Sequence, residues 1–180
     1  MEKLLKIPYT VFNNDWDLLQ QFLERKGNPR YELVGNVELH GRDIIDLGNL
    51  VQVYGLLHLE DSSIQSFKNL VRVDGDLNLR WSSIQSLGSL EYVGKSLDLR
   101  ETPIKSLGNL KYVGMDLLLD DTRIKSLENL EYIGNDLDLS TSSIKTLGNL
   151  GYVGNKVYLS GKNKIPKQQL IKFHIEYLDF

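Results

Sequence analysis

Apolar residues recur along this chain with a period of 20 positions. Between Tyr31 and Leu170 the sequence aligns with itself in rows of 20 without a gap, which gives seven rows. The first six rows carry apolar residues at six equivalent positions, and the seventh has Lys164 and Lys167 at two of them. In the fourth row the apolar residues are Val93, Leu97, Leu99, Ile104, Leu107 and Leu110. A fixed period of this length is typical of a solenoid, in which stacked coils share one continuous core.

The spacing inside each row predicts one main strand per coil. Leu97 and Leu99 flank Asp98, and this period of two places both leucines on one side of a strand and the aspartate on the other. We expect the seven equivalent segments, from 37–39 to 157–159, to form one parallel sheet. A coil of 20 residues is too short to add a full helix, so the return path should consist of turns, 3₁₀ turns or short extended pieces.

Small and polar residues hold fixed places between the apolar ones. Glycines recur at 94, 114, 134 and 154, and one place later in the row at 35, 55 and 75, which predicts bends with positive φ. Two polar sets recur as well: the hydroxyls of Ser62, Ser82, Thr102, Thr122 and Ser142, and the amides of Asn49, Asn69, Asn109, Asn129 and Asn149. We interpret both as structural, because polar groups in such turns bond to the backbone.

Residues 97–104 resemble the LxLxxNxL half of a leucine-rich repeat, with Thr102 in place of the asparagine. Residues 106–114 also resemble the glycine-marked coils of receptor L domains. The resemblance extends to short repeat proteins of bacteria, bacteriophages and large viruses. It implies a mainly β, right-handed, leucine-rich-repeat-like solenoid of seven coils, although the usual asparagine ladder and first consensus leucine are missing.

Both ends of a solenoid expose its core, so caps are expected. Asn14 can cap a helix from about Asp15 to Lys26 that stops at Gly27. Pro166 can open a second helix that buries Leu170, Phe173, Ile175 and Leu178. We therefore expect a single domain over residues 1–180, with a helical cap at 1–30, the repeat solenoid at 31–165 and a C-terminal cap at 166–180.

Composition narrows the class of protein. With 41% hydrophobic and 25% charged residues the chain reads as one globular unit, and the absence of cysteine excludes disulfides, thiolate zinc sites and a cysteine nucleophile. No apolar run is long enough for a signal sequence or a membrane span, so we expect a cytoplasmic protein without a membrane partner.

The residues that point outward from the main strands, with the first residue of the following turn, form what we call the acidic strand face. They vary from coil to coil, and they include eleven acids and three bases. The acids are Glu38, Glu60, Asp61, Asp76, Asp98, Glu101, Asp116, Asp120, Asp121, Asp136 and Asp138, and the bases are Arg80, Arg100 and Lys156. This balance disfavours direct binding of nucleic acid and favours another protein with a basic patch.

Within this face the sequence predicts a set of partner-binding residues around the central coils. Trp81, Arg80 and Arg100 are of the types that dominate interface energetics, and Leu118 is apolar where neighbouring coils carry aspartate. The full set is His58, Glu60, Arg80, Trp81, Asp98, Arg100, Leu118 and Asp120. The alternative interpretation is that Trp81 covers a strand edge while the arginines neutralise Glu60, Asp98 and Asp120.

Two further sets admit two interpretations each. Tyr92, Tyr112, Tyr132 and Tyr152 should stack one coil apart, either as packing on the flank or as a binding strip. Lys105, Lys125 and Lys145 form a basic line on the return path, either as solvated charges or as a small anion site.

Enzymatic interpretations have little support. His40 and His58 with Glu38 and Glu60 form a metal-capable set on paper, but we interpret them as charge-paired neighbours and expect no metal site. The chain has no nucleophile elbow, phosphate loop or HExxH motif. Carboxylates on the acidic strand face could reach glycosidase-like separations, but a flat sheet offers no pocket. We expect no enzyme and no cofactor.

Two hypotheses for function remain. The first is a non-enzymatic protein-binding module that acts by steric masking or scaffolding through the acidic strand face. The resemblance to phage-borne repeats implies, in particular, an inhibitor of a host defence protein. The second is a carbohydrate or small-ligand binder that uses Trp81, Tyr158 and the acids around them. The sequence does not indicate the oligomeric state.

Overall fold

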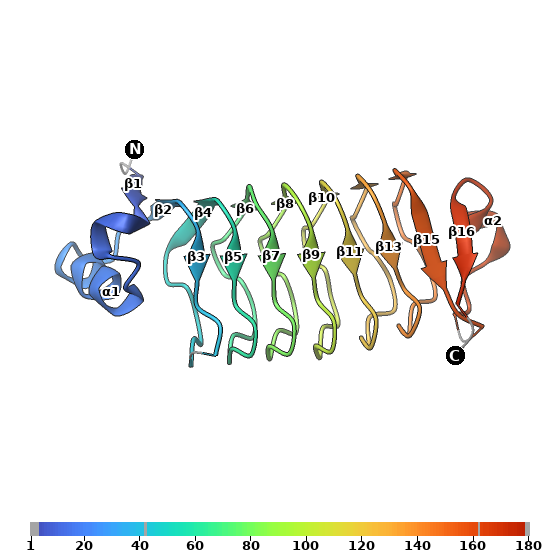
Figure 1. The fold of residues 1–180 in the computed structure, drawn as a ribbon, viewed down its shortest axis with the longest axis horizontal. Coiled ribbons are helices and arrows are strands. Elements are labelled where there is room, and N and C mark those ends of the chain that lie inside the picture. Colours follow the sequence, from blue (N-terminus) through green and yellow to red (C-terminus); the bar gives the residue numbers. More distant parts are fainter. Residues whose placement is uncertain (1–3, 42, 162, 179–180) are drawn as a thin grey trace.

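The chain folds as an elongated solenoid of stacked coils (Figure 1). The structure, a computed structural model, describes residues 4–41, 43–161 and 163–178, so the outermost residues of both predicted caps lie outside the described residues. Two parallel sheets of eight strands run the length of the molecule. Sheet A contains, in order, β1 (Leu5–Pro8), β2 (Tyr31–Val34), β4 (Leu50–Tyr54), β6 (Arg72–Val73), β8 (Tyr92–Val93), β10 (Tyr112–Val113), β12 (Tyr132–Ile133) and β14 (Tyr152–Val153). Sheet B contains β3 (Val37–Glu38), β5 (Leu57–His58), β7 (Leu77–Asn78), β9 (Leu97–Asp98), β11 (Leu117–Leu118), β13 (Leu137–Asp138), β15 (Lys156–Leu159) and β16 (His174–Tyr177).

The predicted solenoid is confirmed, and its seven main strands lie side by side in sheet B with every pair parallel. The structure differs from the prediction of one sheet, because the return path also pairs from coil to coil and forms sheet A. Its strands are short extended pieces in strict register, as where Tyr112 and Val113 pair with Tyr132 and Ile133. Each coil therefore contributes two strands, one on either side of the core.

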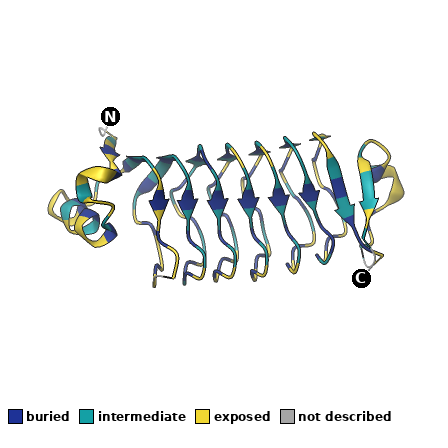
Figure 2. Ribbon diagram, in the orientation of Figure 1, coloured by how far each residue is buried: buried dark blue, intermediate teal, exposed yellow. Residues whose placement is uncertain are grey.

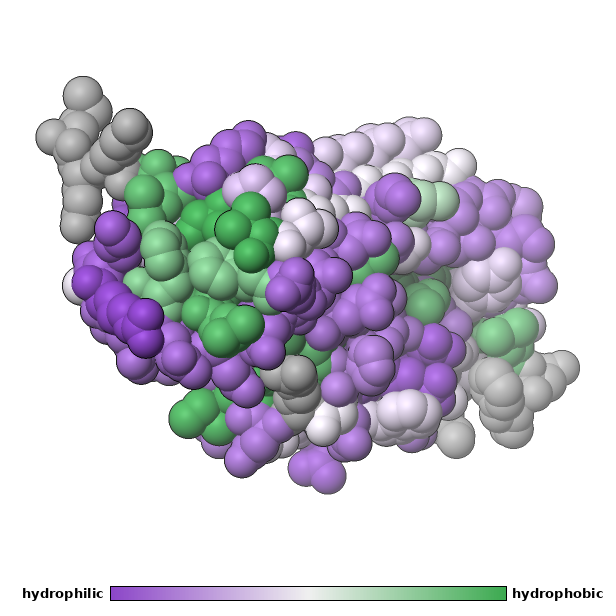
Figure 3. Space-filling model, turned by 60° about the vertical axis from the view of Figure 1, so that its left-hand side comes forward, coloured by the Kyte–Doolittle hydropathy of each residue, from purple (hydrophilic) through white to green (hydrophobic). Residues whose placement is uncertain are grey.

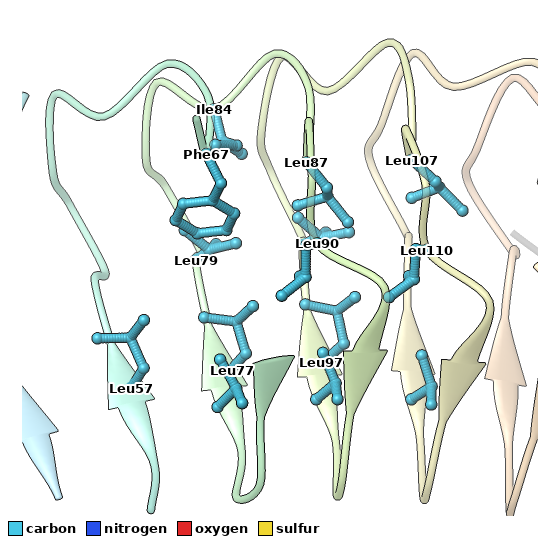
Figure 4. Close-up of a cluster of buried hydrophobic side chains, with 14 of the residues drawn as sticks. Leu57, Phe67, Leu77, Leu79, Ile84, Leu87, Leu90, Leu97, Leu107 and Leu110 are labelled. Atoms are coloured by element: carbon cyan, nitrogen blue, oxygen red, sulfur yellow. The ribbon is translucent and has the colours of Figure 1, made fainter. Parts of the chain in front are cut away.

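The core fills the space between the two sheets and the turns that join them. Leu97 and Leu99 from sheet B, Val93 from sheet A and Ile104 from the turn are all fully buried. Figure 4 shows the leucines of successive coils stacked on one another, with Phe67 in one leucine position. The inward sides of the sheet B strands are buried along the solenoid (Figure 2), which confirms the assignment of inward and outward positions.

The glycines at 94, 114, 134 and 154 serve close approach between coils, so the prediction of positive φ is wrong for them. None of these four has positive φ, and the prediction is also wrong for Gly55 and Gly75, whereas Gly35 has a φ of 112°. A Cβ on Gly114 would lie 2.0 Å from the carbonyl oxygen of Gly94, and one on Gly134 would lie 1.9 Å from that of Gly114. A side chain at these positions would push neighbouring coils apart.

Members of both polar sets satisfy backbone groups at the turns. Thr102 Oγ1 donates to the carbonyl of Leu99 at 2.6 Å, and Thr122 and Ser142 repeat this bond one and two coils further on. Asn69 Nδ2 donates to the Gly48 carbonyl of the preceding coil at 3.1 Å, as Asn129 does to Gly108. The structural interpretation is confirmed for these residues, whereas the buried hydroxyls of Ser62 and Ser82 have no hydrogen-bond partner among the described residues.

The N-terminal cap is only partly helical: β1 pairs with β2 as the first strand of sheet A, and a 3₁₀ turn, η1 (Tyr9–Phe12), and the helix α1 (Trp16–Arg25) follow it. The capping residue is Asp15 and not Asn14 as predicted: its carboxylate accepts hydrogen bonds from the amides of Asp17 and Leu18. Trp16, Leu19 and Leu23 are buried by α1. Figure 3 shows hydrophobic side chains gathered on this end of the molecule.

The C-terminal cap differs from the predicted helix. The helix α2 (Lys167–Leu170) has only four residues, and the chain then adds β16 to sheet B beside β15. Leu170 is buried, while Phe173 and Ile175 pack partly buried against the core from the segment around β16. The apolar spacing that suggested a helix thus belongs to a strand. Among the described residues there is no helix with the length and hydropathy needed to cross a membrane.

Candidate binding face on sheet B

Sheet B places the predicted partner-binding residues in adjacent rows on one face. His58, Asn78, Asp98, Leu118 and Asp138 lie in register on five consecutive strands. Glu60, Arg80, Arg100 and Asp120 come two residues later in their coils and form the row beside them. The predicted set therefore forms one contiguous surface, and all its members except Trp81 are half-buried by their neighbours.

Trp81 stands at the corner where the sheet B strand turns into the return path. Its side chain is 54% exposed and its backbone has a φ of 59°, a left-handed conformation that bulky residues seldom adopt. Asp61, Glu101 and Asp121 share this conformation in neighbouring coils, and Gly41 occupies the same place in the first. In these five coils the turn has positive φ, a conformation that favours glycine, yet it carries a tryptophan here.

Arg80 is held between two neighbours. Its guanidinium lies 4.1 Å from the centroid of the Trp81 ring and bonds the carboxylate of Glu101 at 2.5 Å. The hydrogen bond from Arg80 lowers the pKa of Glu101. Arg80 is therefore a fixed platform beside the tryptophan, and the carboxylate it neutralises is Glu101 and not Glu60 as the alternative interpretation assumed.

Arg100 forms a compact pair with Asp98, as that interpretation expected. Its Nε and Nη2 both bond the Asp98 carboxylate, the shortest contact being 2.6 Å, and this hydrogen bonding raises the pKa of Arg100. Asp120 lies within reach of the same cluster. Burial, and next the charge of Asp138, raise the pKa of Asp120, whose buried Oδ1 has no hydrogen-bond partner within the described residues.

Leu118 separates two carboxylates. Its register partners are Asp98 on one side and Asp138 on the other, so an apolar side chain interrupts an otherwise polar row. It lies beside the Arg100 cluster and one coil beyond it. The centre of the face thus combines an aliphatic side chain with a pair of charges already bonded to each other.

Glu60 and His58 occupy the N-terminal part of the face. Glu60 Oε1 accepts a hydrogen bond from Asn78, and Oε2 is buried without a partner among the described residues. His58 lies in register with Glu38 and Asn78. In the described part of the chain, no group of three or more histidine, aspartate and glutamate side chains is placed to hold a metal ion. The set of His40, His58, Glu38 and Glu60 is therefore not arranged as a metal site.

One column of the face has a structural role that sequence reasoning missed. Asp76, Asp116 and Asp136 each accept a hydrogen bond from the backbone amide at the same position in the next coil, at 2.9–3.1 Å. Asn36 does the same for Leu56. The signal in the sequence was the recurrence of Asn, Asp or Ser at this position in most coils, and these acids hold adjacent coils together.

The negative charge of the face persists after its internal pairs are formed. The three bases are all bonded within the chain: Arg80 to Glu101, Arg100 to Asp98, and Lys156 to Glu176 of β16 at 2.6 Å. The face holds eleven of the 24 acids of the chain and three of its 21 basic residues. A partner therefore meets a surface whose unpaired charges are carboxylates.

The two other sets lie away from this face. The four tyrosines stack on the outer side of sheet A with ring centroids 4.6–4.8 Å apart and rings within 10° of parallel, which confirms their predicted stacking. Lys105, Lys125 and Lys145 are exposed at the return path, and none of them has an ion pair among the described residues.

Comparison of this chain with protein-family models, with curated proteins and with solved structures gave no significant match.

Proposed function

We propose that this chain is a non-enzymatic protein-binding module that masks a basic surface of its partner with the acidic strand face. The partner is a folded protein, because a long and nearly flat row of strands offers a broad surface and not a pocket. As an inhibitor or as a scaffold, such a module acts by occupying the surface that another molecule would need.

The observation that carries the proposal is the conformation and exposure of Trp81. The positive φ of Trp81 favours glycine at this position, and the tryptophan remains half-exposed. A large exposed aromatic ring on a strained residue, stacked on an arginine, is the arrangement expected of an interface anchor. Because Trp81 lies at the edge of the acidic strand face, a basic partner contacts this apolar anchor and the nearby carboxylates together.

The charge of the face supports a basic partner. Opposite charges across an interface accelerate association and exclude wrong partners, and the effect weakens as salt screens the charges. Binding by this face should therefore slow markedly between low and high salt. An apolar partner surface would show no such dependence.

The test is a matched capture from extracts of the native host, followed by titration with the purified partner. Three baits are compared: the wild-type chain, Trp81→Gly, and the double variant Lys105→Glu with Lys125→Glu. We choose Trp81→Gly over reversal of Arg80 and Arg100, since those arginines bond Glu101 and Asp98 and their reversal would disturb the face itself.

The expected result is a protein retained by the wild-type and lysine-variant baits and lost by Trp81→Gly. Titration should then show one-to-one binding weakened at least about tenfold by Trp81→Gly, as for an interface anchor. Equal binding by Trp81→Gly, with loss by the lysine variant, would place the partner on the return path. A bait that binds glycans and retains no protein would favour the carbohydrate hypothesis.

A further inference from the structure

Sheet A ends at the C-terminal end of the solenoid with an open strand edge. Sheet B continues past its last coil strand into β16, but among the described residues no strand follows β14 in sheet A. Tyr152, Gly154 and Asn155 are exposed, and Val153 is half-buried although its equivalents Val93, Val113 and Ile133 are fully buried. The apolar column is therefore left uncovered at this edge.

The edge of β14 presents backbone carbonyls that can accept hydrogen bonds. In the preceding coil the carbonyls of Glu131, Ile133 and Asn135 accept hydrogen bonds from amides of coil seven at 2.9–3.2 Å. The equivalent carbonyls of Gly151, Val153 and Asn155 receive no hydrogen bond within the described residues. Three acceptors thus stand in register, ready for the amides of one more parallel strand.

The tyrosine stack is capped at one end and open at the other. At its first end the Arg72 guanidinium lies 3.7 Å from the centroid of the Tyr92 ring. At its last end Tyr152 stacks on Tyr132 with one face, and its side chain is 49% exposed. An aromatic or guanidinium group on an added strand would complete the stack in the way that Arg72 does.

We propose that the β14 edge binds an extended segment of another protein, which adds to sheet A as a further parallel strand. The preceding coils define what fits: an outward tyrosine or arginine over Tyr152, then an inward β-branched residue over Val153, then glycine as in coils four to seven. Glycine is required because a Cβ at this place would approach the carbonyl oxygen of the coil below to about the 2.0 Å found for Gly154 against Gly134.

A second copy of this chain does not supply such a strand. Its first strand in sheet A is β1, in which Lys6 and Ile7 hold the outward and inward places and Pro8 takes the place of glycine. Proline has no amide hydrogen to donate to the edge and adds a ring where a single Cβ is already too close. The occupant we infer is therefore a segment of a different protein.

The experiment titrates the full-length chain, labelled with ¹⁵N, with a capped peptide that copies residues 129–136, Asn-Leu-Glu-Tyr-Ile-Gly-Asn-Asp. Chemical-shift changes should be confined to residues around β14. Two changes should each weaken binding at least tenfold: Gly134→Ala in the peptide and Tyr152→Ser in the protein. Tyr92→Ser, a tyrosine at the capped end of the stack, serves as the matched control and should bind as wild type.

Several results would overturn the proposal. They are an absence of shifts up to the solubility limit of the peptide, equal affinity for the Gly134→Ala peptide, and shifts that map to the outer side of sheet B. Concentration-dependent self-association of the chain that Tyr152→Ser abolishes would also contradict it, because it would make a second copy the occupant. These outcomes are independent of Trp81, so they leave the proposed function of the acidic strand face to its own test.

Discussion

At the scale of single residues, outward positions divide into those that hold the coils together and those that do not. Asp76, Asp116 and Asp136 bond the next coil, and Asp98 and Asp138 bond the amide two residues on. Among the described residues, the Trp81 side chain makes no comparable hydrogen bond with the backbone. The division matters for mutagenesis, because loss of an acid from the first group disturbs the coil as well as the surface.

The first prediction concerns the stability cost of Trp81. Trp81→Gly removes the side chain from a residue in the left-handed conformation, which should stabilise the fold by about 1 kcal/mol or more. The variant also loses the stacking of Trp81 on Arg80, and glycine makes the unfolded chain more flexible. Together these two effects should destabilise the fold by about as much. The free energy of unfolding, measured by urea denaturation, should stay within about 1 kcal/mol of wild type. A loss above about 2 kcal/mol would show that the tryptophan serves the fold and not a partner.

The second prediction concerns pH and Asp120. The folded state raises the pKa of Asp120, by burial and then by Asp138, so the folded chain binds this proton more tightly than the unfolded chain. The contribution of Asp120 to stability must then fall as pH rises from the unfolded-state pKa through the higher folded-state pKa. Asp120→Asn removes this dependence.

In urea denaturation, Asp120→Asn and wild type should have equal free energies of unfolding at about pH 3, below the ordinary carboxyl pKa. Near about pH 7 the variant should be the more stable, by no more than about 1 kcal/mol for a partly exposed group. A difference of the same size at both pH values would mean that ionisation of Asp120 carries no penalty in the fold.

Residue identities alone did not determine which charges pair. The sequence places Glu60, Asp98, Glu101 and Asp120 all near the arginines, and the choice of Glu101 by Arg80 depends on side-chain rotamers and on the αL turn at Glu101. The pairing of Arg100 with Asp98 was predictable, because residues two apart on a strand share one face. The contiguity of the predicted site followed from the repeat itself.

At the scale of strands and turns, the role of a leucine in sheet B depends on whether its side chain points inward to the core or outward to solvent. The third prediction uses the adjacent pair in β11 and its continuation, Leu118 and Leu119. Leu119 is fully buried, so Leu119→Ala should cost about 2–5 kcal/mol through transfer and cavity terms. Leu118→Ala, outward and half-buried, should cost less than about 1 kcal/mol. Equal denaturation midpoints for the two variants would contradict the assignment of faces.

The fourth prediction tests the close approach of the coils. Gly114→Ala places a methyl group 2.0 Å from the Gly94 carbonyl oxygen, so two coils must separate, and the loss of stability should reach about 3 kcal/mol or more. Gly161→Ala is the matched control, because a Cβ there meets no atom within 4 Å and φ is not positive. Similar thermal midpoints for both variants would mean that the glycine column does not set the coil spacing.

The strands of sheet A show why part of the fold was not predictable from the pattern. Tyr112 and Val113 form a strand with a single inward apolar residue, Val113, so no alternation of apolar and polar residues marks it in the sequence. The prediction of a C-terminal helix was wrong because the apolar residues Phe173, Ile175 and Leu178 fit helical spacing only loosely. The segment instead forms β16, which pairs with β15. The main strands of sheet B were predictable, because each carries two inward apolar residues, Leu-x-Leu or Val-x-Leu, on either side of an outward residue.

At the scale of the whole molecule, the solenoid separates its surfaces by chemistry. The acidic strand face lies on sheet B, the tyrosine stack on sheet A, and the lysine column on the return path between them. In a solenoid each coil contacts only its neighbouring coils, so one surface can be altered without disturbing the structure of the others. This independence is what makes the lysine double variant a fair control for a change at Trp81.

The most direct test of the binding face uses the two tryptophans of the chain. Trp16 is buried in the N-terminal cap and Trp81 is exposed on the acidic strand face, so fluorotryptophan labelling should give two ¹⁹F resonances, only one of them solvent-sensitive. At saturation with the purified partner, the Trp81 resonance should shift and lose its solvent sensitivity while that of Trp16 stays in place. An unchanged Trp81 resonance in the fully formed complex would contradict binding through this face.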